Sequence, residues 1–398
     1  MLLSLAIILL LGFAAGALCR AIRLPSLLGM LLVGMAIGPY ALNLIDPKLL
    51  GISAELRKIA LIIILMRAGL SLNLDDLKRI GRPAVLMCFV PATFEIIGMV
   101  LLAPKLLGIS VLDSAILGAV VGAVSPAVIV PKMLRLMDEG RGTKERIPQL
   151  ILAGASVDDV FVIVLFSVFT GLAQSGSVSM MAFTRIPVSI ALGIVVGGLV
   201  GAFFTFIFAH FHIRDTVKLV FLMCTAFIMA AFEDGVPVVP FSAMLAVMSM
   251  GVALRQLRRV VAVRLTERMA KLWVIAEVML FVLVGATVNL RYAIASGASA
   301  LLLLFLVLLF RAVGVCICLI KTPLNRKERL FCVLAYLPKA TVQAAIGGVP
   351  LAMGLPCGEV VLTIAVLSIL VTAPLGALLI DATSRRLLSA PAGYPEEG

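Results

Sequence analysis

Long apolar runs recur from one end of the chain to the other, separated by short connections that are polar or contain glycine and proline. About 20 apolar residues in a helix cross the ~30 Å hydrocarbon core of a bilayer, so each run predicts a transmembrane helix. We predict thirteen spans, although the third is short and only the polar break Glu233-Asp234-Gly235 separates the eighth from the ninth, so twelve or fourteen also fit. The spans are 2–19, 26–44, 57–72, 83–107, 112–133, 147–171, 186–209, 217–232, 238–254, 272–289, 293–319, 327–352 and 358–380. The expected fold class is an all-α polytopic membrane protein with one transmembrane domain over residues 1–398.

Composition and charge agree with a membrane protein and give it an orientation. The chain is 62% hydrophobic and 14% charged, whereas soluble domains contain about 25% charged residues. Its net charge of +12 would also suit a nucleic-acid-binding protein, but connections after odd-numbered spans carry 24 lysines and arginines against 6 in the others. Positive loops stay in the cytoplasm. We therefore expect no nucleic acid, an N-terminus outside, a cytoplasmic C-terminus and a multi-pass protein of a bacterial inner membrane.

The cysteines and the first apolar run predict no resident cofactor and no cleaved leader. The seven cysteines lie in or at the ends of spans, without metal-ligand spacing or a disulfide framework. The first run lacks a charged n-region and a small-residue cleavage site, so it is expected to be a span rather than a signal peptide.

Two spans contain helix breakers at matching places. An offset of seven spans inverts orientation, so spans 1–6 pair with spans 8–13 as in inverted-repeat carriers. Span 5 contains Gly122-Ala123-Val124-Ser125-Pro126-Ala127, and its mate, span 12, contains Tyr336-Leu337-Pro338-Lys339-Ala340-Thr341. A proline removes a backbone hydrogen bond, and a broken helix at membrane depth is tolerated only where it lines a cavity within protein. Either break alone fits a simple kink, but the matched pair predicts two crossed, broken helices.

Two adjacent acids, Asp158 and Asp159, lie within the apolar segment 147–169. Two ionised side chains at the bilayer centre cost about 5 to 7 kcal/mol, so intramembrane acids indicate an ion or proton pathway. Consecutive helix residues point about 100° apart, so one acid is expected to face a cavity and the other the helix break or Lys339. A site that holds either a proton or a small hard cation makes the two compete. Sodium or lithium prefers oxygen ligands, and the candidates are Asp159, Asp158, a carbonyl near Val124, and the hydroxyl of Ser125 or Ser156.

Five further charged residues lie inside the predicted spans. Glu95 on span 4 and Arg311 on span 11 are symmetry mates, and we predict a mainly structural ion pair between them because arginine stays protonated. Lys339, next to the break in span 12, is expected to compensate the negative end of a half-helix or to be a plain buried counter-charge. Structural roles are expected for the remaining charged residues and the two histidines, with pH sensing as the alternative for the histidines: Arg67, Glu277, His210 and His212.

These motifs resemble those of the cation:proton antiporters. Ala155-Ser156-Val157-Asp158-Asp159 is similar to the paired-aspartate motif of that superfamily. The segments 122–128, with Pro131 beyond, and 337–347 resemble the NHA branch, the solute carrier 9 subfamily B type. The likeness extends from Arg67-Ala68-Gly69-Leu70 to Thr372-Ala373-Pro374, nearly the whole chain.

The resemblance implies a homodimeric antiporter that exchanges sodium or lithium for protons and is not an enzyme. A core of approximately 83–171 and 293–380 would move against a scaffold of approximately 1–72 and 186–289 in an elevator-like cycle. Asp159 would be the main carrier of the cation and proton, with Asp158 as its partner. Glu95 and Arg311 match positions that form a salt bridge in this branch. Arg311, where some relatives have a lysine, favours one proton per cation if Lys339 stays charged.

Several alternatives remain open at the level of the sequence. A potassium/proton exchanger or a sodium-coupled organic solute symporter fits the same fold. An intramembrane aspartyl protease also uses two membrane carboxylates, but they come from separate helices and here they are consecutive. A passive cation channel would favour rings of acids or carbonyls.

Overall fold

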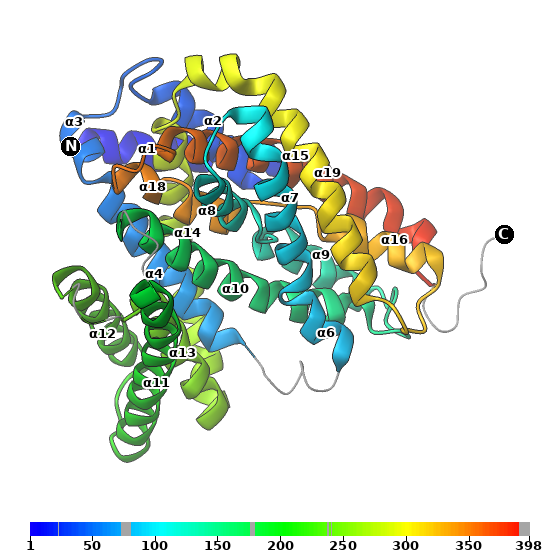
Figure 1. The fold of residues 1–398 in the computed structure, drawn as a ribbon. Coiled ribbons are helices and arrows are strands. Elements are labelled where there is room, and N and C mark those ends of the chain that lie inside the picture. The colour runs from blue at the N-terminus through cyan, green and yellow to red at the C-terminus, as the bar shows by residue number, and fades with distance from the viewer. Residues whose placement is uncertain (23, 73–80, 176–179, 237–238, 240, 390–398) are drawn as a thin grey trace. The chain divides into compact units, whose positions relative to one another are not determined.

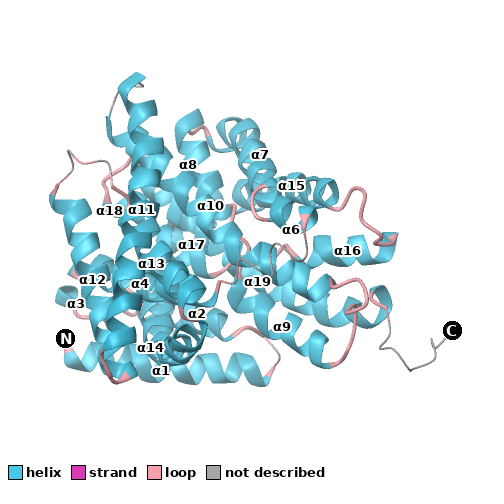
Figure 2. Cartoon of the chain, turned by 90° about the horizontal axis from the view of Figure 1, so that it is seen from below, coloured by secondary structure: helices cyan, strands magenta, loops and turns pink. Residues whose placement is uncertain are grey.

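The computed structural model describes residues 1–22, 24–72, 81–175, 180–236, 239 and 241–389, without the side chains of 156, 175, 180–187 and 290–296. All regular secondary structure in this part of the chain is helical (Figure 2). The chain divides into two compact units. The first contains Met1–Ala54, Asp76–Phe166 and Phe281–Gly398, and the second contains Glu55–Asp75 and Ser167–Leu280.

The first unit holds most of the short and broken helices (Figure 1). Its helices are α1 (Leu2–Ala21), α2 (Ser26–Ile37), α3 (Pro47–Gly51), α6 (Arg82–Met87), α7 (Val90–Leu107), α8 (Val111–Val121), α9 (Pro126–Asp138), α15 (Leu290–Cys318), α16 (Arg326–Ala335), α17 (Thr341–Ile346), α18 (Val349–Ala352) and α19 (Gly358–Leu387). Three long helices, α4 (Ser53–Ser71), α10 (Ile147–Ser175) and α14 (Arg259–Ala286), each contribute residues to both units.

The second unit is built from long, unbroken helices. In addition to its parts of the shared helices it contains α11 (Met180–His210), α12 (Asp215–Gly235) and α13 (Ala243–Leu257). Helix α13 packs against both α11 and α12. A Cβ atom at Gly197 of α11 would lie 2.1 Å from the carbonyl oxygen of Ala246 on α13, so only glycine allows this backbone approach.

The helices confirm a polytopic membrane protein. Among the described residues, nine helical segments are long and apolar enough to cross a bilayer. Shorter apolar helices cover Ser26–Ile37, Ala243–Leu257 and Thr341–Ala352. All the predicted apolar runs contain helix, but the number of thirteen spans stays a prediction.

The predicted second span, 26–44, is wrong in its second half. Helix α2 ends at Ile37, and Gly38 adopts an extended conformation, with ψ of 173°. The residue before a proline is disfavoured in the helical region, and Pro39 follows directly. Hydropathy alone extended this span because the next residues are also apolar.

The basic connection between the predicted spans 238–254 and 272–289, residues 255–271, is largely helical. Helix α14 already begins at Arg259, directly after α13. Val261, Ala262, Leu265 and Met269 are buried along one face of it, with the helical spacing that places side chains on the same side. The basic residues Arg259, Arg264, Arg268 and Lys271 therefore belong to an amphipathic helix end rather than to a loop.

Helix α19 positions the second broken helix. It packs against each of the short helices α16, α17 and α18, and also against α8 and α9. A Cβ atom at Gly376 would lie 2.3 Å from Cγ of Pro338, so a glycine at this position allows α19 to approach the break between α16 and α17. Lys339 N–H in the same break donates to Thr372 Oγ1 of α19 at 2.9 Å.

Candidate functional site

The two helix breaks predicted from the sequence are present and touch each other. Helix α8 ends before Gly122 and α9 begins at Pro126, where a proline suits the first helical turn. Helix α16 ends at Ala335 and α17 begins at Thr341. Ser125 N–H in the first break donates to Pro338 O in the second at 2.8 Å. The two interruptions therefore form one buried crossing in which each supplies a partner for the backbone of the other.

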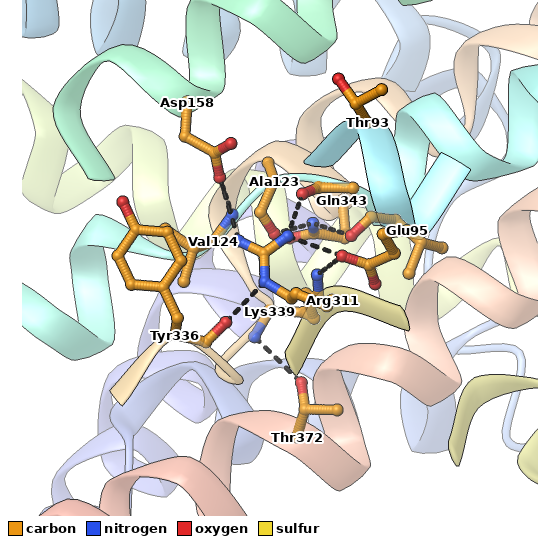
Figure 3. A network of polar contacts seen from close by, with 12 residues as sticks. Thr93, Glu95, Ala123, Val124, Asp158, Arg311, Tyr336, Lys339, Gln343 and Thr372 are labelled. Carbon is orange, nitrogen blue, oxygen red and sulfur yellow. Dashed lines mark hydrogen bonds and ion pairs between the residues drawn. The ribbon is translucent and has the colours of Figure 1, made fainter. Parts of the chain in front are cut away.

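Arg311 of α15 is the centre of this crossing (Figure 3). Its side chain is fully buried, and its Nε–H donates to Tyr336 O at 2.7 Å. Its Nη1 donates to Gly122 O. Tyr336 and Gly122 are the residues at the C-terminal ends of α16 and α8, where the helix dipole is negative and a cation is favourable. A single guanidinium therefore compensates the carbonyl ends of both half-helices.

Arg311 also joins two carboxylates, each of them fully buried. Its Nη1 lies 2.6 Å from Glu95 Oε2 and its Nη2 lies 3.2 Å from Asp158 Oδ2. Glu95 comes from α7, which packs along α15, and Asp158 comes from α10. The planar fork of arginine can serve several acceptors at once. The structure thus brings together the predicted partners Glu95 and Arg311, and adds Asp158 to the pair.

Lys339 lies in the second break with its side chain fully buried. Its Nζ is 2.6 Å from Glu95 Oε2. The expected compensation of a half-helix end by Lys339 is provided here by hydrogen bonds from Arg311, because a branched guanidinium can reach both carbonyl ends while the single ammonium is held by Glu95. Lys339 contributes its charge to the same cluster.

The adjacent acids have different surroundings. Asp158 Oδ2 accepts from Val124 N–H in the first break at 2.8 Å and from Arg311. Asp159, 9% exposed, has no ion pair within 4.0 Å among the described residues, and its Oδ1 is buried without a hydrogen-bond partner. The contact of Asp158 with the helix break agrees with the expectation for one of the two acids, while the cavity-facing role of Asp159 stays a prediction.

With all its groups ionised, the cluster would carry one more negative than positive charge. It contains the two cations Arg311 and Lys339 and the three carboxylates of Glu95, Asp158 and Asp159. Burying unbalanced charge is costly. One added proton or one monovalent cation would make the cluster neutral.

Unpartnered oxygens gather on the residues of the first break and on the two acids. Asp158 Oδ1, Asp159 Oδ1 and Ser125 Oγ are buried without a hydrogen bond in the described part of the chain. Val124 O in the same break receives no hydrogen bond there either. Carboxylate, hydroxyl and carbonyl oxygens are the ligands that hard cations prefer. The predicted ligand Ser156 cannot be compared with the others, because its side chain lies outside the described residues.

A cavity of about 840 Å³ within the first unit is lined by residues of α9 and by charged ends of other helices. Its walls include Ala127, the second residue of α9, and Lys132 farther along the same helix. Lys132 forms an ion pair with Asp381 of α19. Arg20 and Arg385, at the ends of α1 and α19, also line the cavity. The cavity wall contains four basic residues and two acidic ones, which are Arg20, Lys132, Arg135, Arg385, Glu139 and Asp381.

The remaining charged residues singled out from the sequence lie elsewhere. Arg67 and Glu277 both belong to the second unit and interact electrostatically with one another. His210 Nδ1 lies 3.0 Å from Phe206 O within its own helix, and His212 is exposed.

Sequence reasoning assigned no role to Gln343, although it lies in the motif 337–347. Its Nε2 donates to Val121 O at 3.2 Å and to Ala123 O at 2.9 Å. The sequence offered one signal for such a role, which is a single polar residue within the apolar stretch 342–346. Its partners could not be known without the crossing of the two breaks.

The chain is similar to known exchangers over nearly its full length. The family model for the sodium/hydrogen exchanger, transmembrane, matches residues 5–384. Human sodium/hydrogen exchanger 9B2 is 36% identical over 388 residues, which cover 92% of this chain and 70% of that protein. Human sodium/hydrogen exchanger 9B1 is 30% identical, with 92% of this chain and 73% of that protein covered.

A solved structure with the same fold is the sodium proton antiporter MjNhaP1 from Methanocaldococcus jannaschii at pH 8. It superposes with a TM-score of 0.83 at 22% identity and covers 96% of this chain and 97% of its own. That identity supports the fold alone, whereas the family match covers most of the sequence. Together with the buried charge cluster at two crossed helix breaks, these findings show that the chain belongs to the transmembrane sodium/hydrogen exchanger family.

Proposed function

We propose that this protein is a secondary active antiporter that exchanges Na⁺, or Li⁺, for H⁺ across a membrane. The observation that carries the proposal is the buried cluster with two cations and three carboxylates, in which Asp159 forms no ion pair within 4.0 Å with any described residue. Membership of the exchanger family supports the same reading.

The charge of the cluster gives a physical reason for exchange. With all its groups ionised the cluster is one charge negative, so a single proton or a single sodium ion neutralises it. Binding both would leave a buried positive charge, which is unfavourable. The two ions therefore compete for Asp159, with Asp158, Ser125 and the Val124 carbonyl as further ligands of the cation.

We place the moving core at approximately 83–171 and 293–380 and the scaffold at approximately 1–72 and 186–289, with an elevator-like movement between them. Both broken helices, all five charged residues of the cluster and α15 belong to the proposed core. The hydrogen bonds between the two breaks support their movement as one body. A homodimer formed through the scaffold would anchor the part that stays still.

The cavity beside α9 is the proposed route of ions to the site from the cytoplasm. It reaches from Ala127 to the cation-rich helix ends. The excess of positive charge in odd-numbered connections assigns that side to the cytoplasm, with the N-terminus outside and the C-terminus inside. A bacterial inner membrane is the proposed location.

The test is exchange in reconstituted proteoliposomes. The vesicle interior is made more acidic than the outside. The loss of this pH gradient is followed as dequenching of a pH-sensitive dye when sodium, lithium or potassium is added outside. The wild-type protein is expected to respond to sodium and lithium, and Asp159→Asn to neither. Full activity of Asp159→Asn would refute the assigned site, and a response to potassium alone would replace the proposal with potassium/proton exchange.

A further inference from the structure

Gln343 holds the backbone of the first break from the opposite half-helix. Its side chain comes from α17, six residues long and directly after the second break. Its Nε2 donates to the carbonyls of Val121 and Ala123, while Arg311 donates to Gly122 between them. Three successive carbonyls at the end of α8 are therefore bound by two side chains from the other half of the sequence, and Figure 3 shows Gln343 and Arg311 beside Ala123.

These two hydrogen bonds also fix which way the amide faces. If the amide were rotated by 180°, its oxygen would point at two carbonyl oxygens within hydrogen-bond distance, which is repulsive. The orientation of a glutamine amide is assigned from such a network, and here the network allows one assignment. The oxygen Oε1 is therefore turned away from Val121 and Ala123.

Gln343 Oε1 is buried and has no hydrogen-bond partner in the described part of the chain. A buried amide oxygen without a partner costs free energy, and every other polar atom of this side chain is satisfied. The hydroxyl of Ser125 and one oxygen each of Asp158 and Asp159 are unpartnered in the same way. Each of these oxygens belongs to a residue of the crossing or of the acid pair.

We propose that Gln343 is a binding residue for the transported cation. The amide nitrogen fixes the carbonyls that precede Val124, and the amide oxygen is a neutral ligand that replaces one water of the dehydrated ion. A neutral oxygen completes the coordination of a monovalent cation without adding negative charge to a cluster that one cation already neutralises. This inference rests on the proposed antiport function and adds a ligand from the second inverted repeat.

The experiment compares Gln343→Leu, which keeps the size but removes both groups, with Gln149→Leu. Gln149 is a suitable control because its Oε1 is also buried without a partner, but it lies on α10 more than two turns before Asp158. Initial exchange rates in proteoliposomes give the KM for sodium and for lithium together with the maximal rate. We expect Gln343→Leu to raise the KM for sodium about tenfold, equivalent to about 1.4 kcal/mol. Its maximal rate at saturating sodium should be largely kept, and Gln149→Leu should leave the KM unchanged.

Binding without transport provides a second readout. At a given concentration, an ion that binds more tightly raises the melting temperature more, so sodium should stabilise the wild-type protein and Gln149→Leu more than Gln343→Leu. A Gln343→Leu protein with a normal KM and a normal stabilisation by sodium would overturn the proposal, as would a loss of maximal rate alone. Failure of the proposed function is distinguishable, since the wild-type protein would then show no exchange that depends on Asp159.

Discussion

The two helix breaks are alike in sequence and differ in what they offer to an ion. Pro126 directly follows the first break and Pro338 lies within the second, and each break follows a half-helix whose terminal carbonyl accepts a hydrogen bond from Arg311. In the first break, Val124 N–H donates to Asp158, while the Ser125 hydroxyl has no hydrogen-bond partner among the described residues. In the second, Lys339 supplies a fixed positive charge that Glu95 holds. The pseudo-symmetry of the repeats is therefore broken, because only the second break contains a fixed positive charge.

This difference explains how a symmetric scaffold produces a single site. A lysine at the first break would repel the incoming ion, and a free acid at the second would create a competing site. Arg311 donates a hydrogen bond to the carbonyl end of the half-helix at each break. Its removal should damage the whole crossing, whereas changes within one break should affect only one property of transport.

The largest effect is expected from Arg311→Ala. Removing one partner of a buried ion pair costs about 3 to 5 kcal/mol, because the remaining charges stay buried. Here Glu95 and Asp158 lose a counter-ion, and two helix ends lose a donor. Denaturant unfolding in detergent should show this loss of stability.

Arg329→Ala is the matched control for that measurement. Arg329 on α16 also donates to backbone carbonyls, those of Leu324 and Thr322, but it binds no buried carboxylate. Its loss should cost about 1 kcal/mol, as for ordinary hydrogen bonds. Equal stability losses in the two variants would contradict the central place of Arg311.

Lys339→Gln should change the pH dependence of exchange. Without this positive charge, the acids of the cluster hold protons more strongly, so a higher pH is needed before sodium can replace them. The pH of half-maximal exchange should rise by about one unit, the lower end of the range for a neighbouring charge.

The exposed lysine at the end of α7, Lys105, provides the comparison for that variant. Lys105→Gln should leave the profile in place. If the pH profile of Lys339→Gln coincides with that of the wild type, the charge of Lys339 has no effect on proton binding by the acids of the cluster, and the prediction is wrong.

The smallest effect is expected at the hydroxyls of the two breaks. Ser125→Ala removes a proposed cation ligand and should raise the KM for sodium about threefold, in line with a net hydrogen-bond-sized term of about 0.5 to 1 kcal/mol. Thr341 at the second break also has a buried, unpartnered hydroxyl. Thr341→Val should leave the KM unchanged. If both changes raise the KM equally, the two breaks are equivalent and the proposed asymmetry is wrong.

Much of the fold was predictable because hydropathy and proline positions act locally. The apolar runs predicted the helices, and the matched breakers predicted both interruptions. The end of α2 at Ile37 and the early start of α14 at Arg259 were missed, since Pro39 and an amphipathic stripe outweigh the average hydropathy of their segments. The interruption between α6 and α7, where Pro91 lies in the first turn of α7, was also not expected.

The sequence by itself determined that two acids, several cations and two broken helices must lie at membrane depth, because burying charge and unpaired backbone in hydrocarbon has so few solutions. It also indicated the Glu95 and Arg311 pair through the symmetry of the repeats. Only the tertiary structure decided which charge meets which. Arg311 rather than Lys339 binds both helix ends, Lys339 binds Glu95, and Gln343 crosses to the other half. These partners are more than 20 residues apart, and the choice between them depends on side-chain reach in three dimensions, which no local pattern contains.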